Sequence, residues 1–256
     1  MKRLLPFILL SWFSLVSANT FASQFNVFLF TKTTEWHHKS INAGVTALEE
    51  MAKLHHFTLE WHEDATLIND KNLERFDAVI FLSTTGDVMN ESQQKSLQKF
   101  VRAGKGFVGI HSASDTEKNW PGFEKLVGRK FKIHPVIQTA KLSNLAPNFP
   151  GLENVAEVQW WTDEWYDFVP NEPAGQDNLR YLLSVDEDSY NTKSDWGNLK
   201  GDGMGEFHPI SWFQNFEGGR SFYTALGHLP ATYKTKQFQD HIYGGIFWAA
   251  TGKGLD

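Results

Sequence analysis

The alternation of short apolar runs with amphipathic segments constrains the fold more than any other feature of this sequence. Apolar runs that predict strands are followed by stretches with helical spacing, such as 39–54 and 91–103. This repeated β-α order calls for right-handed crossovers and predicts an α/β fold with a doubly wound, mostly parallel sheet. Between residues 138 and 223 the pattern shifts toward β, which predicts a β-rich insertion. The predicted strands of the α/β part are 25–31, 57–61, 76–82, 106–110 and 222–226, and a last helix is predicted over 233–251.

The N-terminus has the features of an export signal. Basic residues open the chain, an apolar stretch follows at 4–16, and Ala18 and Ala22 supply the small residues that a signal peptidase prefers. We therefore expect a signal peptide over 1–22, a single domain over 23–256, and a periplasmic or secreted bacterial protein. The apolar stretch is shorter than the roughly 20 residues of a membrane-spanning helix, so no stable membrane insertion is expected.

Composition excludes several classes of function. The chain contains no cysteine, which rules out disulfides, thiolate metal ligands and a cysteine nucleophile. Its net charge of -6 argues against a nucleic-acid partner, because phosphate binding relies on clustered basic residues. No glycine-rich loop precedes a helix in the pattern that cradles phosphates, so no nucleotide cofactor is expected. The 10 tryptophans instead favour a small-molecule carbohydrate, whose apolar C–H surface stacks on indole rings. The oligomeric state is left open.

Polar side chains follow several of the predicted strands. The strand at 106–110 runs directly into His111, Ser112 and, shortly after, Asp115. One of the histidines at 37 and 38 follows the first strand in the same way, and His228 follows the last. Because ligands of open parallel sheets bind at the carboxyl ends of the strands, we expect these side chains to converge on one site.

Five sequence motifs together resemble one known family. They lie at 31–41, 106–115, 163–166, 208–212 and 218–228, and they are similar to those of the ThuA-like, or trehalose-utilisation, family. That family resembles the flavodoxin-like fold of the class I glutamine amidotransferases. The amidotransferases carry a cysteine on the turn after the fourth strand and a histidine after a late strand, and here His111 and His228 match these places. Since imidazole does not replace a thiolate nucleophile, no glutamine amidotransferase activity is expected.

The candidate site contains enough imidazole and carboxylate for acid-base catalysis or for a divalent metal, and spacing does not decide between the two. His111, His228 and Glu164 are the candidate catalytic residues, with His111 as the base. A metal, with zinc favoured, would be held by His37, His134 and Glu164. The candidate substrate-binding residues are Trp36, Ser112, Asp115, Trp165, Tyr166 and His208.

The resemblance implies an exported enzyme of carbohydrate catabolism that acts on a disaccharide or glycoside, or on the 3-keto form of such a sugar, in which the 3-hydroxyl group has been oxidised to a ketone. A 3-keto group acidifies the neighbouring C–H bond, so one base and one electrophile suffice for elimination, hydration or isomerisation. A conventional glycosidase is a weaker alternative, because no clear pair of acids is present. Two further alternatives are a non-catalytic carbohydrate-binding protein, stacking sugar on Trp36, Trp161 and Trp165, and a scaffold that kept the fold without the cysteine.

Overall fold

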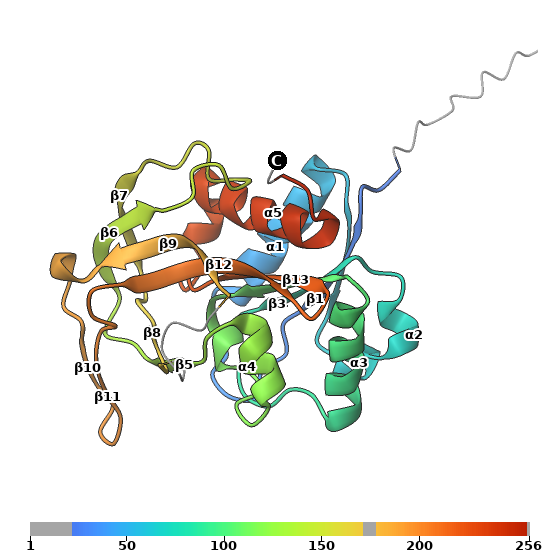
Figure 1. Ribbon diagram of the computed structural model, residues 1–256, viewed down its shortest axis with the longest axis horizontal. Helices are drawn as coiled ribbons and strands as arrows, with labels where there is room; N and C mark the ends of the chain where they lie inside the picture. Colours follow the sequence, from blue (N-terminus) through green and yellow to red (C-terminus); the bar gives the residue numbers. More distant parts are fainter. Residues whose placement is uncertain (1–21, 171–177, 255–256) are drawn as a thin grey trace, which may run out of the picture.

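A mixed nine-stranded sheet forms the centre of the computed structural model, which describes residues 22–170 and 178–254 (Figure 1). The predicted signal peptide over 1–22 lies outside the described residues except for its last position. The strand order is β2-β1-β3-β4-β13-β12-β9-β6-β7. The predicted α/β class is therefore confirmed.

The first five strands in this order are parallel and form the predicted half of the sheet. The interior strands of this half are almost wholly apolar and fully buried, because helices cover both of their faces. Five of the predicted strands correspond to these elements. They are β1 (Asn26–Phe30), β2 (Thr58–His62), β3 (Ala78–Leu82), β4 (Gly106–Ile110) and β13 (Gly219–Thr224). The bounds of β4 agree with the prediction, and those of the others differ by up to three residues.

Helices lie on both faces of the sheet (Figure 1). The helices α1 (Ile41–Leu54) and α5 (Lys236–Thr251) pack on one face, while α3 (Glu91–Arg102) and α4 (Pro121–Val127) pack on the other. The paired glycines of α5 allow close packing: a Cβ atom at Gly245 would lie 2.5 Å from the ring of Phe222 in β13, and one at Gly244 would lie 1.7 Å from the carbonyl oxygen of Pro150 in the loop over 145–157. Shorter helices are α2 (Asp70–Leu73), η1 (Ala65–Leu67), η2 (His111–Asp115), η3 (Glu187–Ser189) and η4 (Thr232–Lys234).

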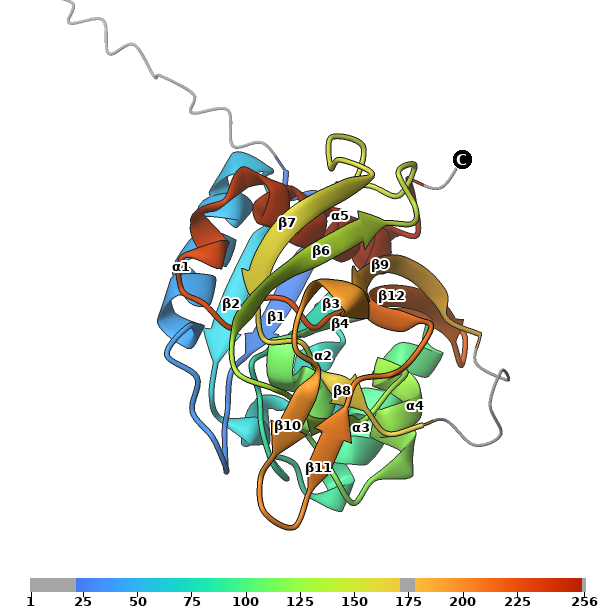
Figure 2. The ribbon, with the colours of Figure 1, turned by 90° about the vertical axis from the view of Figure 1, so that its left-hand side faces the viewer.

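The β-rich insertion between β4 and β13 extends the main sheet instead of forming a separate layer. Its four long strands pair antiparallel, which makes the whole sheet mixed. It also contains two small antiparallel sheets, β5-β8 and β10-β11, and Figure 2 shows the β10-β11 hairpin projecting from the body of the molecule. The insertion consists of β5 (Phe131–Ile133), β6 (Gln138–Asn144), β7 (Val158–Asp163), β8 (Asp167–Phe168), β9 (Arg180–Asp186), β10 (Lys193–Asp195), β11 (Lys200–Asp202) and β12 (His208–Phe216).

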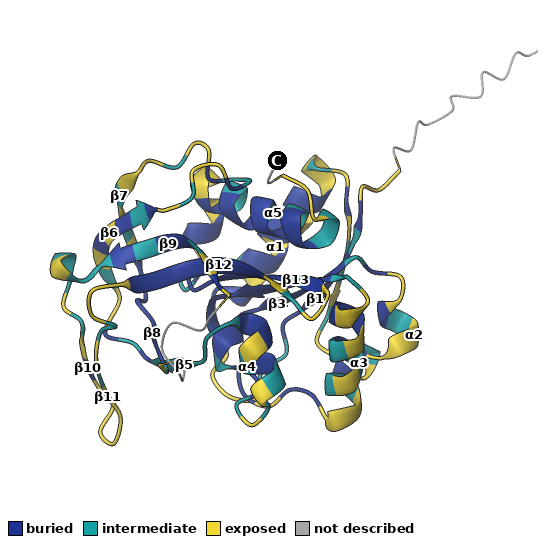
Figure 3. Cartoon of the chain, viewed as in Figure 1, coloured by how far each residue is buried: buried dark blue, intermediate teal, exposed yellow. Residues whose placement is uncertain are grey.

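Burial is concentrated in the central sheet and on the helix faces that pack against it, whereas the hairpins and outer helix faces are exposed (Figure 3). Within the described ranges, none of the helices has both the length and the apolar character needed to cross a bilayer.

Candidate active site

A cavity of about 630 Å³ opens beside the carboxyl ends of β1, β4 and β13. This volume is in the range typical of small-molecule sites. The cavity combines aromatic, imidazole, carboxylate and ammonium groups, contributed by loops after the parallel strands and by the insertion. It is lined by Glu35, Trp36, His38, Ser112, Asp115, Lys118, Lys130, Phe131, Lys132, His134, Glu164, Tyr166, Trp196, Leu199 and His228.

Three histidines and one glutamate converge at this cavity. His38, His111, Glu164 and His228 each offer one ligand atom, and the four atoms lie within 4.8 Å of one another. Oε2 of Glu164 is 2.9 Å from Nδ1 of His228 and 3.6 Å from Nε2 of His111, and the two ring nitrogens are 3.3 Å apart. Ligand atoms around a tetrahedral zinc ion, with bonds near 2.0 Å, are about 3.3 Å apart. Three of the four ligand atoms are therefore spaced as around such an ion, and the ligand atom of His38 lies within 4.8 Å of each of them.

The backbone at the end of β4 directs His111 into this cluster. His111 has a positive φ of 55°, which is uncommon for a residue other than glycine and is found often at functional sites. Its Nδ1 donates a hydrogen bond of 2.8 Å to the carbonyl oxygen of Ala225. This bond fixes the tautomer, so the lone pair of a neutral ring is on Nε2, facing the other three residues.

Burial keeps two of the histidines neutral. It lowers the pKa of His111 well below its usual value and that of His38 to about 3, and the neighbouring histidines add to the effect. His228 differs: burial lowers its pKa, but the adjacent carboxylates of Glu164 and Asp163 outweigh burial and leave the pKa raised. Neutral imidazole is the form that binds metals, so His38 and His111 are suited to that role near neutral pH.

A buried carboxylate holds two members of the cluster in place. Asp163, at the end of β7, accepts hydrogen bonds from the backbone N–H groups of Glu164, Gly227 and His228 at 2.9–3.0 Å. These bonds join the end of the insertion's outer strand to the loop after β13. Burial raises the pKa of Asp163 to about 6, against the opposing effect of the three N–H donors.

His134 lies at the accessible side of the cluster. Its Nδ1 donates to the carbonyl oxygen of Pro135 at 2.7 Å, which leaves the lone pair of a neutral ring on Nε2. Nε2 is 3.5 Å from Oε2 of Glu164. The ring stacks on Tyr166 and meets Trp196 edge-on, with centroids 5.6 and 4.9 Å apart. His134 thus combines a fixed tautomer with access to the cavity.

Four of the six residues predicted to bind substrate line the cavity. Trp36 is 69% exposed, and the hydroxyl oxygen of Ser112 lies 3.2 Å from Nδ1 of His38. Asp115 pairs with Lys118 at 3.0 Å. The hydroxyl group of Tyr166 is 2.9 Å from Nε2 of His111, so it also contacts the cluster.

The structure places the other predicted residues away from the cavity. Trp165 is fully buried, and its indole N–H donates to the backbone carbonyl of Gln138. His208 is buried behind Tyr166 and bonds to its carbonyl oxygen through Nε2. His37 is exposed, and its Nδ1 lies 3.1 Å from the hydroxyl oxygen of Thr33. The neighbouring residue, His38, belongs to the cluster instead.

Several cavity residues were not predicted from the sequence. Trp196 and Leu199 come from the β10-β11 hairpin, and no local pattern places such a hairpin over side chains that are distant in the sequence. The sequence does contain a signal for Lys130 and Lys132. Residues 130, 132 and 134 alternate along the segment that forms β5, and alternate residues of a strand share one face.

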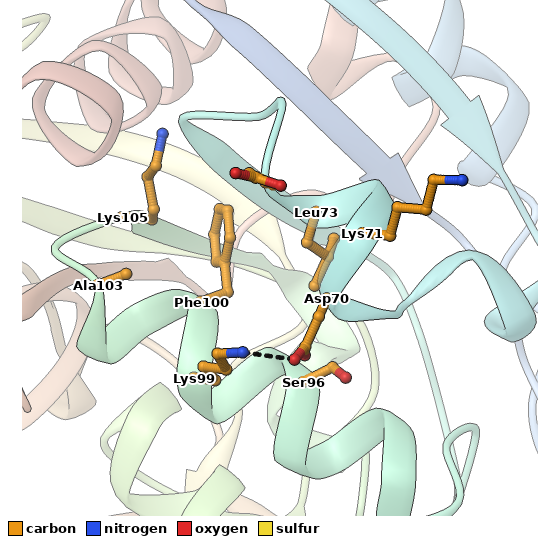
Figure 4. Close-up of a pocket in the computed structure, with 9 residues that line it drawn as sticks. Asp70, Lys71, Leu73, Ser96, Lys99, Phe100, Ala103 and Lys105 are labelled. Atoms are coloured by element: carbon orange, nitrogen blue, oxygen red, sulfur yellow. Dashed lines mark hydrogen bonds and ion pairs between the residues drawn. The ribbon is translucent and has the colours of Figure 1, made fainter.

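A second cavity of about 520 Å³ lies between α2 and α3 (Figure 4). Leu73 and Phe100 form its apolar floor, and Lys99 pairs with Asp70 across it at 2.6 Å. The residues that line it include no histidine and no buried carboxylate. Its charged groups are exposed except for the half-buried Lys105, and two of its lysines are already paired, Lys99 with Asp70 and Lys105 with Asp77. Since imidazoles and a buried carboxylate converge at the first cavity and not at this one, the histidine cluster is the candidate active site.

The chain belongs to the ThuA family, described as trehalose utilisation, whose family model matches residues 26–249. The resemblance predicted from the motifs is therefore confirmed, and the family indicates a carbohydrate-related role. No curated protein matches the chain significantly.

Solved structures agree with this family. A ThuA-like protein from Bacteroides uniformis has a TM-score of 0.74 at 19% identity, covering 93% of this chain and 98% of its own. Another from Parabacteroides merdae has a TM-score of 0.70 at 18% identity, with coverages of 91% and 92%. A β-galactosidase from Bacillus circulans sp. alkalophilus has a TM-score of 0.54 at 11% identity, and the match covers 87% of this chain and 31% of that enzyme. At these identities the likeness shows the fold alone.

Proposed function

We propose that this protein is an exported, metal-dependent enzyme of carbohydrate catabolism that acts on a disaccharide or on a 3-keto-glycoside. The observation that carries the proposal is the convergence of three imidazoles and one carboxylate at an open cavity. Export rests on the signal-like segment at 1–22. The carbohydrate substrate rests on the trehalose-utilisation family and on the exposed indole rings of Trp36 and Trp196 beside the cluster.

The strand order supports a doubly wound architecture for the parallel half. The order β2-β1-β3-β4-β13 corresponds to the 2-1-3-4-5 order of flavodoxin-like sheets, with β13 as the fifth strand. In such sheets ligands bind at the carboxyl ends of the strands, where the cluster lies. We expect no glutamine amidotransferase activity, because the turn after β4 carries His111 and the sequence contains no cysteine.

The donor set fits a divalent metal, with zinc as the first candidate. His38, His111, His228 and Glu164 would hold it, and imidazole with carboxylate is a common zinc ligand set. Oε2 of Glu164 is buried and has no hydrogen bond of good geometry within the described residues, as expected of an oxygen that binds a cation. A bound divalent metal would supply Lewis acidity toward a carbonyl oxygen or a water molecule.

We assign proton transfer to Nε2 of His134 instead of His111. His111 is fully buried, does not line the cavity and directs Nε2 into the cluster, so a substrate C–H bond cannot reach it. His134 lines the cavity with its Nε2 lone pair available. On a 3-keto-glycoside, this nitrogen would take the proton from C2, and the electron pair of the C–H bond would form the enolate of the ketone.

The second step follows from the position of the glycosidic bond. The enolate re-forms the ketone as its electrons make a C1–C2 double bond and the C1–O bond breaks, so the leaving alkoxide takes up the proton from His134. The products are an unsaturated keto-sugar and the free alcohol.

A second candidate function is the binding of a sugar without catalysis. The exposed indole ring of Trp36, on which a sugar ring could stack, favours this candidate.

Metal binding tests the site directly, and the chain provides a matched control. His38→Ala should lower the zinc affinity of the purified full-length protein at least about 100-fold, because it removes one of four ligands. His37→Ala, which changes the exposed neighbouring histidine, should leave the affinity unchanged. Competition with a chromogenic chelator measures both. Equal affinities of the two variants would contradict the proposed ligand set.

Turnover separates the enzyme from the binding protein. The zinc-loaded protein is incubated with trehalose, cellobiose and their 3-keto derivatives, and product formation is followed by mass spectrometry. We expect the keto-sugar to be consumed, and His134→Gln to reduce kcat by about 100-fold while zinc affinity stays within a few-fold of wild type. Saturable binding without product would favour the non-catalytic alternative.

A further inference from the structure

We infer that the cavity recognises a sugar that carries an anionic oxygen group, bound by the side chains of Lys130 and Lys132. This inference rests on the proposed function and names its substrate class. The anionic group is a carboxylate, as in a uronic acid, or a sulfate or phosphate ester, which present the same oxyanion to an ammonium group.

Both lysines belong to the same wall as His134. The segment around β5 places residues 130, 132 and 134 at alternate positions, and all three line the cavity. The two lysine side chains are partly exposed, so they reach the cavity without losing their hydration completely. An oxyanion held by this wall would lie beside the imidazole to which we assign proton transfer.

Lys118, the third lysine of the cavity, is already neutralised. Its Nζ lies 3.0 Å from Asp115 and 2.5 Å from Glu35, both of which line the same cavity. Lys130 donates one hydrogen bond of 2.9 Å to the backbone carbonyl of Lys118, and an ammonium group has three donors. Lys130 therefore retains donors for a ligand.

The distribution of charge along the cavity favours an anion at one wall. Three ammonium groups and three carboxylates line the cavity; Glu35 and Asp115 lie beside Lys118, and Glu164 lies among the histidines. Asp115 also interacts with Lys130, and Lys132 interacts with Asp167, which is buried in β8 and does not line the cavity. The stretch at 130–134 thus carries two ammonium groups and no carboxylate, so an anionic oxygen group would meet positive charge there.

The test compares sugars that differ by one anionic group. Binding to the zinc-loaded, full-length protein is measured by calorimetry for methyl glucoside and methyl glucuronide, and for glucose, glucose 6-sulfate and glucose 6-phosphate. We expect at least one anionic sugar to bind about tenfold more tightly than its neutral partner, with the preference weakening as salt is raised. The glucuronide and ester arms distinguish the two sources of the oxyanion.

Variants assign the preference to the two lysines. The double change Lys130→Met and Lys132→Met keeps the apolar stems and removes the charges, so it should abolish the anionic preference while neutral sugars bind within about twofold of wild type. Lys193→Met, an exposed lysine of β10 that does not line the cavity, is the control and should retain the preference. Equal binding of neutral and anionic sugars by the wild type would overturn this inference and leave the proposed function intact. Failure of all five sugars to bind would also overturn this inference, whereas the proposed function is decided separately by turnover of the 3-keto-glycosides.

Discussion

Asp163 shows how one buried side chain organises the candidate site. An Asp163→Asn change would replace an acceptor oxygen by an NH₂ group that faces backbone N–H donors. We expect this to lower the free energy of unfolding by about 2–4 kcal/mol, because buried donors lose a charged acceptor. Zinc affinity should fall as well, since Glu164 and His228 depend on these bonds for their position.

Urea unfolding and zinc titration measure the two effects. Asp188→Asn is the matched control, because Asp188 is exposed and its side chain makes none of these contacts. If Asp163→Asn unfolds at the same urea concentration as wild type, Asp163 does not have the organising role assigned to it.

From the sequence, the types of residue that form the site could be predicted better than the individual residues. It predicted that His111 and His228 would converge, because both follow parallel strands. It could not decide whether His37 or His38 belongs to the site, because the conformation of the loop after β1 determines which of the two side chains points toward it. Trp165 was predicted to stack on sugar, yet burial of a tryptophan depends on contacts across the insertion that no local pattern reports.

At the scale of elements, the β10-β11 hairpin forms one wall of the cavity. Its base is anchored by Glu187. The carboxylate of Glu187 accepts hydrogen bonds from the backbone N–H groups of Met204 and Gly205, and it lies 2.7 Å from Nδ1 of His208. These bonds hold the hairpin so that Trp196 meets the ring of His134. His208 thus supports the cavity from behind, although it does not line it.

Removing the indole at the hairpin tip should weaken sugar binding without unfolding the protein. Trp196 is 51% exposed, so Trp196→Ala should leave the melting temperature within about 2 °C of wild type. Loss of a stacking surface worth about 0.5–1.5 kcal/mol should raise KM or Kd about 2–10-fold. Trp160→Ala, on the edge strand β7 and 63% exposed, should change neither quantity. A Trp196→Ala protein that binds sugar with wild-type affinity would exclude the stacking role.

The hairpin also marks the limit of prediction at this scale. The strands and helices of the parallel half were predictable because each shows a clear apolar period. The short strands β5, β8, β10 and β11 have two or three residues each, which is too short for a period to appear. They are stabilised by tertiary contacts, and they supply much of the cavity wall.

At the scale of the whole molecule, the order of the strands follows from two different rules. The β-α order of the sequence predicts right-handed crossovers between the parallel strands, which lie in the order β2-β1-β3-β4-β13. The insertion could have formed a separate layer, and its pattern does not exclude that. It continues the sheet because β12 pairs with β13 through the tight turn at Glu217 and Gly218, where both residues have positive φ.

The packing of α5 on this sheet predicts how the stability of the molecule depends on pH. His241 is buried between α5 and the sheet, with its ring against Phe222 and Nε2 3.2 Å from the hydroxyl of Ser211. Burial lowers its pKa from 6.5 to about 3. Between these values the unfolded chain binds a proton that the folded protein does not, so the free energy of unfolding falls as the pH is lowered.

From pH 7 to pH 5 this single group should remove about 2 kcal/mol of stability. His241→Phe cannot take up the proton, and Ser211 keeps its hydrogen bond to the carbonyl of Tyr223. Urea unfolding at both pH values should therefore show a loss about 2 kcal/mol smaller in the variant than in the wild type, and the other buried histidines cancel in this comparison. Should His241→Phe fold poorly, His241→Leu serves the same purpose. If the free energy of unfolding fell by the same amount in the variant and the wild type, α5 would separate from the sheet, or admit water to His241, before the molecule unfolds.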